Sequence, residues 1–232
     1  MRYAIYFAPA PEDRLHDLGS RWLGRDAITG ETLPQPDVAG ISNGDLAAVT
    51  RDPRRYGFHA TLKAPFALAD DATVEDLIAE MESFAGEQNG FDLDLGVNCL
   101  SGFLALTPTA PSVDLDRLAA ECVRRFDRFR APISEADMAR RRPDLLTERQ
   151  RGYLKDWGYP YVFEDFRFHM TLTDRLDGTV VERMGAAART YFAQASAAPI
   201  RIDRIALFSE AEPGAAFRLQ RFLPFSRGDI GN

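Results

Sequence analysis

Two of the three histidines lie in the same frame, Phe-His-x-Thr-Leu, once in GFHATLKAPF and again in FRFHMTLTDRL. In an extended strand, residues two apart point to the same side. We therefore expect His59 to share one face with Thr61, and His169 to share one face with Thr171, while the apolar residues between them are buried. Two imidazoles at one groove suit a displacement at phosphorus: one accepts a proton from the nucleophile, and the other donates a proton to the leaving oxygen.

The residue types of the repeated frame fit this chemistry. The pKa of a histidine in a peptide is near ~6.5, so that both the neutral and the protonated imidazole exist at neutral pH. The threonine hydroxyls can donate hydrogen bonds to the non-bridging oxygens of a phosphate. A single His-x-Thr is more often a half-buried histidine bonded to a neighbour, and the repetition is what favours catalysis. The third histidine, His16, has no such frame and is predicted to lie on a helix surface.

Cationic and aromatic residues beside the two motifs are candidates for substrate binding. Continued strand alternation places Lys63 and Arg167 on the faces of the histidines, where each would add positive charge next to a phosphate. Arg55 comes just before the first motif strand. Tyr56 and Tyr161 are candidates for lining the groove. Each of these residues has a plain alternative as a surface charge or as packing.

The segment 131–160 fits no simple strand–helix unit. It contains Arg140, Arg141 and Arg142 in succession, a pattern that is most often a solvated helix face. The alternative is a lid whose arginines contact an anionic substrate. The aromatic residues at the end of the segment would equally serve to anchor it.

No metal or cofactor is expected. The two motif histidines have no acidic cluster beside them, and the acid–base chemistry described above requires no metal. Cys99 and Cys122 match no metal-binding or redox spacing. Cys122 falls on the apolar side of a predicted helix and is therefore expected in the core.

The elements that must position these residues alternate in a mixed order, which is typical of an α+β protein. Each motif strand is followed by one helix and a strand pair, so we expect two related lobes of antiparallel sheet, with outer helices and a central groove, in one domain over 1–232. Residues 25–55 are predicted as an irregular connection with one short helical turn. The predicted strands are 2–9, 57–66, 91–100, 102–108, 166–176, 200–210 and 217–225, and the predicted helices are 11–24, 73–87, 112–130 and 179–195.

The composition restricts the partners. The chain has 232 residues, 45% of them hydrophobic and 27% charged, with a formal net charge of −7. Its overall field does not attract a long polyanion, so we expect a small phosphorylated substrate rather than long nucleic acid. No apolar stretch approaches the ~18 residues of a membrane span, and the first residues lack the pattern of a signal peptide. A cytoplasmic location is expected, and the oligomeric state stays open.

Paired His-x-Thr motifs on two similar lobes are the signature of the two-histidine (2H) phosphoesterase superfamily, which this chain resembles. The phrases RYAIYFAP, SRWLGRDAITGE, DPRRYGFHATLKAPF and WGYPYVFEDFRFHMTLTDRL resemble a narrower family that is often encoded beside the C–P lyase machinery of phosphonate breakdown. The resemblance implies a bilobal α+β fold and metal-independent opening of cyclic phosphodiesters. It also implies that His59, Thr61, His169 and Thr171 form the catalytic set.

The narrower resemblance suggests a substrate, ribose 1,2-cyclic phosphate bearing a 5-phosphate, or a related compound of phosphonate breakdown. Two other functions stay open. One is an RNA-end enzyme acting on 2′,3′-cyclic or 2′–5′ linked termini. The acidic net charge argues against a long RNA partner but not against a short terminus. The other is a non-catalytic module that binds a nucleotide or sugar phosphate, against which the two intact proton-transfer groups argue.

Overall fold

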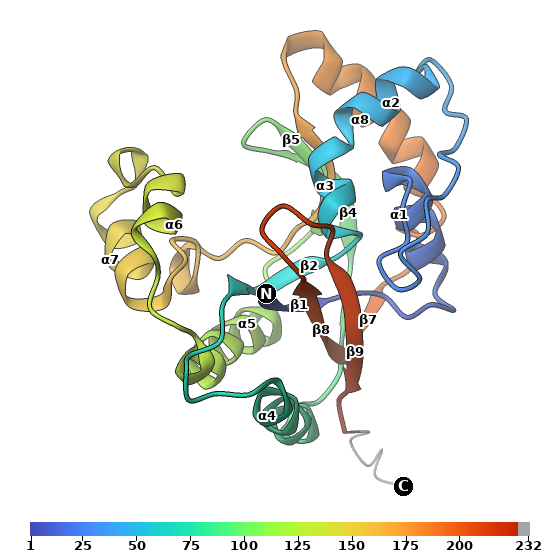
Figure 1. Cartoon of the computed structure of the whole chain (residues 1–232). Helices are drawn as coiled ribbons and strands as arrows, with labels where there is room; N and C mark the ends of the chain where they lie inside the picture. Colours follow the sequence, from blue (N-terminus) through green and yellow to red (C-terminus); the bar gives the residue numbers. More distant parts are fainter. Residues whose placement is uncertain (227–232) are drawn as a thin grey trace, which may run out of the picture.

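The computed structural model describes residues 1–226, and its strands pair in antiparallel fashion throughout the named sheets (Figure 1). Seven strands form one sheet in the order β4-β5-β6-β2-β1-β8-β9, and β3 pairs with β7 in a small second sheet. With helices outside these sheets, the α+β class is confirmed. The strands are β1 (Arg2–Phe7), β2 (Ala60–Phe66), β3 (Phe91–Leu93), β4 (Leu95–Leu100), β5 (Phe103–Pro108), β6 (Met170–Arg175), β7 (Ile200–Ile202), β8 (Arg204–Glu210) and β9 (Arg218–Pro224).

The four predicted helices, α1, α4, α5 and α8, are present, and residues 1–226 contain four further helices, α2, α3, α6 and α7. The prediction of one short helical turn in 25–55 was wrong, because α2 and α3 both form there. Ser42 caps α2, its hydroxyl accepting a hydrogen bond from the Asp45 amide at 3.0 Å, in a stretch whose Gly and Asn content favours an irregular chain. The helices are α1 (Arg14–Leu23), α2 (Asn43–Val49), α3 (Arg51–Tyr56), α4 (Val74–Glu87), α5 (Val113–Phe126), α6 (Glu135–Arg140), α7 (Glu148–Trp157) and α8 (Gly178–Phe192).

The large sheet consists of two halves that meet at the motif strands. β4-β5-β6 and β2-β1-β8-β9 are joined through β2 and β6, whose pairing is the single bridge Ala60–Met170. Each motif strand is followed by a helix and strands, as predicted. However, the strands that follow β2 pair with β6, and those that follow β6 pair with β1. The two halves therefore exchange hairpins, and neither is built from one continuous part of the chain.

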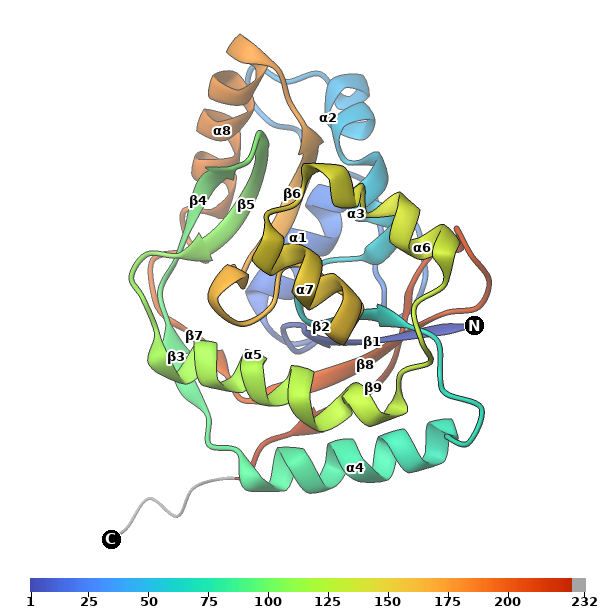
Figure 2. The same ribbon diagram turned by 90° about the vertical axis from the view of Figure 1, so that its left-hand side faces the viewer.

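Helices cover both halves of the sheet. α4 and α5 lie side by side along one half (Figure 2), where α5 contacts β2 and α4 contacts β8 and β9. α8 packs on β4 and β5 at the other half, and α1 contacts both α8 and β6. Within residues 1–226, no helix is both long and apolar enough to cross a membrane.

The apolar residues of the two motifs are buried beneath these helices. Met170 and Leu172 have no exposed surface, and Trp22 of α1 donates its indole N–H to the Leu172 carbonyl at 2.9 Å. Phe58, next to a motif histidine, lies against Gly19 of α1 so closely that a Cβ atom there would be 2.2 Å from the ring. Gly19 thus allows α1 to support the start of the first motif.

The segment 131–160 is helical rather than irregular, and it lies over the motif strands. α6 and α7 stand beside the sheet in Figure 1, and Figure 2 shows α7 in front of β2. Thr147 begins α7 with a reciprocal capping box shared with Gln150. Tyr153 and Trp157 of α7 pack edge-on against Phe163, with ring centroids 5.5 and 5.2 Å apart, and so anchor the segment.

Candidate active site

Both motif histidines are fixed by the same backbone contact. Nδ1 of His59 lies 2.9 Å from the Gly57 carbonyl oxygen, and Nδ1 of His169 lies 2.6 Å from that of Arg167. A carbonyl only accepts hydrogen bonds, so Nδ1 of each ring carries the proton and donates it. Nε2 of each neutral ring is therefore the atom that can take up a proton, and at His59 it lies 3.4 Å from the Thr61 hydroxyl oxygen.

Gly57 shapes the turn that makes this contact for His59. Its φ of +82° lies in the region that residues with a Cβ rarely adopt, and a Cβ there would lie 2.4 Å from the Cβ of Ala27. The glycine that precedes the first Phe-His pair is thus required by both backbone and packing. It places its own carbonyl under the imidazole.

The pairing of β2 with β6 brings the two motifs together. Ala60 is paired with Met170, so in the antiparallel arrangement His59 neighbours Thr171, and Thr61 neighbours His169. The four side chains line one pocket of about 350 Å³. The motif strands are thus neighbours in one sheet, with the histidine–threonine pairs crossed on its open face.

His59 is enclosed by aromatic rings. Tyr6 of β1 stacks on it, with ring centroids 3.8 Å apart, and Tyr56 lies at 6.1 Å. Burial, assisted by charge repulsion from His169, lowers the pKa of His59 to about 4 against the opposing effect of the hydrogen bond to Gly57. His59 is therefore a neutral imidazole at neutral pH in the unliganded protein.

His169 has a different neighbour. The Phe103 ring lies 5.6 Å away at a tilt of 58°. Burial lowers the pKa of His169 from its usual value, while the hydrogen bond to the Arg167 carbonyl raises it. Within the aromatic contacts of the described chain, the close stacking found at His59 has no counterpart here.

The prediction for Lys63 was wrong. Its side chain is 4% exposed, and Nζ donates to Asp127 Oδ1 at 3.0 Å and to the Val123 carbonyl at 3.3 Å. The cause is a register shift between β1 and β2. Thr61 pairs with Tyr6 and Lys63 pairs with Ile5, so a step of two residues on β2 faces a step of one residue on β1. Such a bulge reverses the alternation of faces, so Lys63 points into the core instead of the site.

The other four predicted binding residues lie in the pocket of the histidines or in a hollow next to it. Arg55 and Tyr56, which end α3, line the pocket with the histidines. Arg167 and Tyr161 line an adjoining hollow of about 380 Å³ that also includes Thr61 and His169. Arg167 is exposed and donates to the Phe166 carbonyl at 2.7 Å.

Several lining residues were not among the predicted set. Arg2 and Tyr6 reach the pocket from β1, and Tyr159 reaches it from the loop after α7. Arg140 and Arg141, weighed above as a lid, line it as well. Arg2 and Tyr6 share a face of their strand, but only knowledge that β1 adjoins β2 would have revealed them.

The remaining polar candidates lie elsewhere. His16 is buried rather than on a surface, with Nε2 3.5 Å from Asp26 Oδ1. Cys122 is in the core as predicted, whereas Cys99 is exposed. Over residues 1–226, no three His, Cys, Asp or Glu side chains gather in a way that could hold a metal ion.

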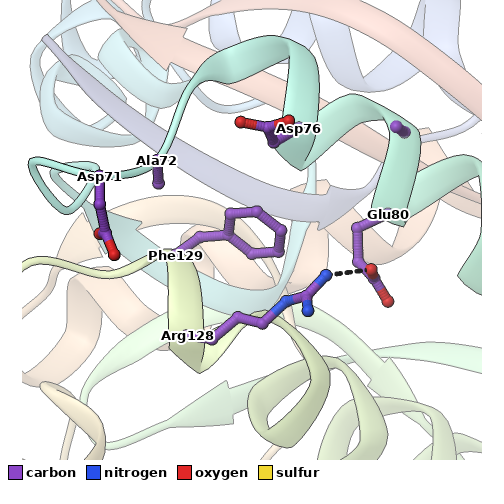
Figure 3. Close-up of a pocket in the computed structure, with 7 residues that line it drawn as sticks. Asp71, Ala72, Asp76, Glu80, Arg128 and Phe129 are labelled. Atoms are coloured by element: carbon purple, nitrogen blue, oxygen red, sulfur yellow. Dashed lines mark hydrogen bonds and ion pairs between the residues drawn. The ribbon is translucent and has the colours of Figure 1, made fainter.

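A second large hollow, of about 550 Å³, lies beside α4 near the end of α5 (Figure 3). Asp71, Asp76 and Glu80 line it together with Arg128, which forms an ion pair with Glu80. Three carboxylates against one guanidinium make a poor environment for a phosphate. The pocket with the histidines is thus the better candidate site.

Two curated relatives carry the name "Ribose 1,5-bisphosphate phosphokinase PhnN". The chain is 43% identical over 230 residues to the protein of Janthinobacterium sp. (strain Marseille), covering 97% of this chain and 51% of the relative. It is 39% identical over 223 residues to that of Laribacter hongkongensis (strain HLHK9), covering 96% and 52%. The chain thus spans about half the length of these relatives.

Two solved structures resemble the fold at a distance. The E. coli LigT complex with NADP+ has a TM-score of 0.42 at 14% identity, covering 97% of this chain and 98% of that one. A structure described as a phosphoesterase has a TM-score of 0.40 at 14% identity, covering 97% and 99%. Likenesses this remote establish no activity.

A protein family described as "Protein of unknown function (DUF1045)" matches residues 61–218. The match includes both hydroxyls of the site, the second motif and the segment that bears α6 and α7. It covers well over half of the sequence, and the chain belongs to this family.

Proposed function

We propose that this chain is a cyclic phosphodiesterase that uses His59 and His169 as general base and general acid. One observation carries the proposal. Both imidazoles have Nδ1 bonded to a backbone carbonyl two residues earlier, and both line one pocket with two threonine hydroxyls. Two proton-transfer groups at one phosphate-sized site are what an in-line displacement needs. Simple binding would not require them.

The reaction follows from this placement. Water attacks the phosphorus of the cyclic diester, and Nε2 of His59 takes one of its protons. The bond from phosphorus to one ring oxygen breaks, and protonated His169 delivers its proton to that oxygen, which leaves as a hydroxyl. Thr61 and Thr171 donate hydrogen bonds to the non-bridging oxygens, where negative charge grows. The products are a phosphate monoester and a free hydroxyl on the same molecule.

The choice of base and acid rests on the surroundings of the two rings. His59 is enclosed by Tyr6 and Tyr56, with Arg55 close behind, and an imidazolium would be costly there. His169 has the more open position beside Phe103. The proton needed by the leaving oxygen is therefore better held by His169.

The substrate we propose is ribose 1,2-cyclic phosphate 5-phosphate. Cleavage of its P–O2 bond gives ribose 1,5-bisphosphate, the compound in the name of the two curated relatives. This chain matches about half of each relative, so a cyclic-phosphate-opening activity in that half would supply the bisphosphate on which the named phosphokinase acts. We also propose that the chain is a member of the 2H phosphoesterase superfamily, which its sequence resembles.

A nucleoside 2′,3′-cyclic phosphate, including one at an RNA end, is the second candidate. The adjoining hollow favours it, because Phe103, Tyr161 and Phe166 offer rings on which a base could stack. The ribose compound has no group that would use these rings.

The segment 131–160 is proposed as a lid within the single domain. Arg140 and Arg141 line the pocket from α6 and its end, and the Arg141 guanidinium lies 4.8 Å from the centroid of the Tyr159 ring. Closure of such a segment over the substrate would bring positive charge and exclude water.

Phosphorus NMR of the purified protein tests the function. The protein, with EDTA, is mixed with ribose 1,2-cyclic phosphate 5-phosphate or with nucleoside 2′,3′-cyclic phosphates. We expect the cyclic phosphate signal to be replaced by that of a monoester, fastest for the ribose compound. Preference for the nucleotides would select the second candidate, and lack of turnover of every compound would overturn the proposal.

A further inference from the structure

A buried carboxylate beside the candidate site holds two arginines at once. Glu210, which ends β8, is fully buried, and its Oε2 accepts a hydrogen bond from Nε of Arg2 at 2.5 Å. Nη2 of Arg2 lies 2.5 Å from the same oxygen and completes the ion pair. Its Oε1 accepts one from Nη1 of Arg55 at 2.8 Å and another from the Gly214 amide at 3.0 Å. Both oxygens are thus occupied, and two positive charges share a single negative one.

The resulting positive charge faces the pocket of the histidines. Arg2 and Arg55 both line it, together with Arg140 and Arg141, and none of the lining residues in the described part of the chain is an Asp or Glu. The Arg55 guanidinium lies 4.2 Å from the centroid of the Tyr56 ring, which is itself 6.1 Å from that of His59. The pair therefore adjoins the His59 side of the site.

Two arginines also share one carboxylate on the surface of the protein, and this pair differs from the one at the site in its exposure and its surroundings. Arg125 and Arg128 both contact Glu80 beside α4, and Figure 3 shows the pair of Arg128 with Glu80. The two arginine side chains are 39% and 65% exposed. Two aspartates also line the hollow at Glu80. At the site, by contrast, the anchor is buried, the arginines are largely covered, and no carboxylate offsets the remaining charge.

Such an arrangement is costly for stability alone. The desolvation of a buried carboxylate must be offset by an opposite charge, and a single bidentate arginine is enough for that. A second arginine adds the desolvation cost of another partly buried charge. Positive charge held rigidly in a pocket without a compensating carboxylate suits an anionic group of a ligand, because the arginines need not be ordered when the ligand binds.

We propose that Arg2 and Arg55, held by Glu210, form a subsite for a second phosphate group of the substrate, distinct from the phosphate that reacts between the histidines. The proposal rests on the proposed phosphodiesterase activity. It narrows the substrate class to cyclic phosphodiesters that carry an additional terminal phosphate. It also orients the substrate, with the terminal phosphate on the His59 side of the pocket.

The test compares two substrates that differ only in this group, ribose 1,2-cyclic phosphate with and without its 5-phosphate. In the unaltered protein, we expect the 5-phosphate to raise kcat/KM by about 10- to 100-fold, the effect of one or two hydrogen bonds between charged groups. In Arg2→Gln and Arg55→Gln, this ratio should fall to within about threefold of one. Arg55→Lys should restore part of it. Arg125→Gln, which alters the surface arginine pair, is the matched control and should keep the full ratio.

A binding measurement separates this subsite from the reaction. Titration calorimetry with ribose 5-phosphate, on a protein carrying His59→Gln and His169→Gln, should show binding that weakens at least about tenfold when Arg55→Gln is added. An unchanged substrate ratio in both arginine variants, or binding that ignores Arg55→Gln, would overturn the subsite. Lack of turnover of both compounds with Arg55-dependent binding intact would instead overturn the proposed reaction alone. Thermal melting of each variant verifies folding.

Discussion

The two halves of the candidate site are alike in backbone and unlike in surroundings. Each contributes a histidine whose Nδ1 is bonded to the carbonyl two residues earlier, followed by a threonine on the same face. On the first half, Tyr6 stacks on the imidazole, and Arg2 and Arg55 lie behind it. On the second half, the ring has Phe103 beside it and an aromatic hollow beyond.

Under the proposed mechanism, this difference would give the two copies of a repeated motif separate roles. The strand and its carbonyl contact fix the tautomer and aim Nε2, and they do so equally in both copies. The neighbours of each ring, which come from other elements, decide how readily it holds a proton. The proposed division into an acid and a base thus depends on residues outside the repeated motif.

Removal of either imidazole should have the largest effect. We expect His59→Gln and His169→Gln each to lower kcat by about 10²- to 10⁴-fold, because each removes a proton-transfer group. A phosphodiester with a nitrophenolate leaving group distinguishes the roles, since that group departs without a proton. It should rescue His169→Gln but not His59→Gln.

His16→Gln is the control for these variants, because it changes a histidine outside the pocket and should leave kcat within about twofold of the unaltered value. Rescue of His59→Gln by the nitrophenyl ester, without rescue of His169→Gln, would reverse the assignment of base and acid. Equal activity of both variants with the unaltered protein would refute the mechanism altogether.

The crossed threonines provide the next test. Thr61→Val and Thr171→Val preserve shape and remove one hydroxyl each, and we expect each to lower kcat by about 10²-fold, as for other donors to a developing oxyanion. Steady-state kinetics on the preferred cyclic phosphate measures this. Thr190→Val on α8, whose hydroxyl donates to the Ala186 carbonyl, is the control and should be close to normal. A change confined to KM would assign the hydroxyls to substrate binding only.

Lys63 tests whether the two motifs remain equivalent beyond the threonines. We expect Lys63→Met to lower the free energy of unfolding by about 1–3 kcal/mol, because a buried ion pair with Asp127 is lost while Arg130 still contacts that carboxylate at 2.9 Å. Urea denaturation measures the loss. The kcat/KM of the folded variant should stay within about twofold of normal, and a large fall would return Lys63 to the site.

The last prediction concerns the pH dependence of stability rather than activity. The pKa of His59 is about 4 in the folded protein and near ~6.5 when unfolded, so the unfolded chain binds more protons between these values. The contribution of His59 to the free energy of unfolding should therefore be fully present above about pH 6.5 and decline as the pH falls toward 4. His169 contributes in the same direction, because burial lowers its pKa too.

Melting temperatures between pH 4.5 and 7 measure this decline. We expect His59→Gln to flatten the curve more than His169→Gln does, because His59 is the more closely enclosed ring. Curves parallel to that of the unaltered protein would show that His59 titrates as it does in the unfolded chain.

The sequence reveals the site better than it reveals the site's neighbours. The His-x-Thr pairs could be predicted because alternation along a strand is a local property, and the long helices because their apolar residues keep a 3.6-residue period, as in α5. The inward orientation of Lys63 could not be predicted, because the bulge depends on the pairing of β2 with β1 and is not visible in the pattern of residues. Arg2 and Tyr6 are 53 or more residues away from His59 in the chain and reach it only through sheet order.

The exchange of hairpins between the two halves of the sheet bears on the origin of the protein. Two copies of an ancestral chain that swapped their strand pairs would have formed a symmetric dimer, and fusion of the two copies end to end would leave the connectivity seen here. In such a dimer both histidines would have been one residue of one gene, with identical surroundings. Fusion would have allowed the two copies to diverge, so that a tyrosine stacked on one imidazole could give the two histidines different affinities for a proton.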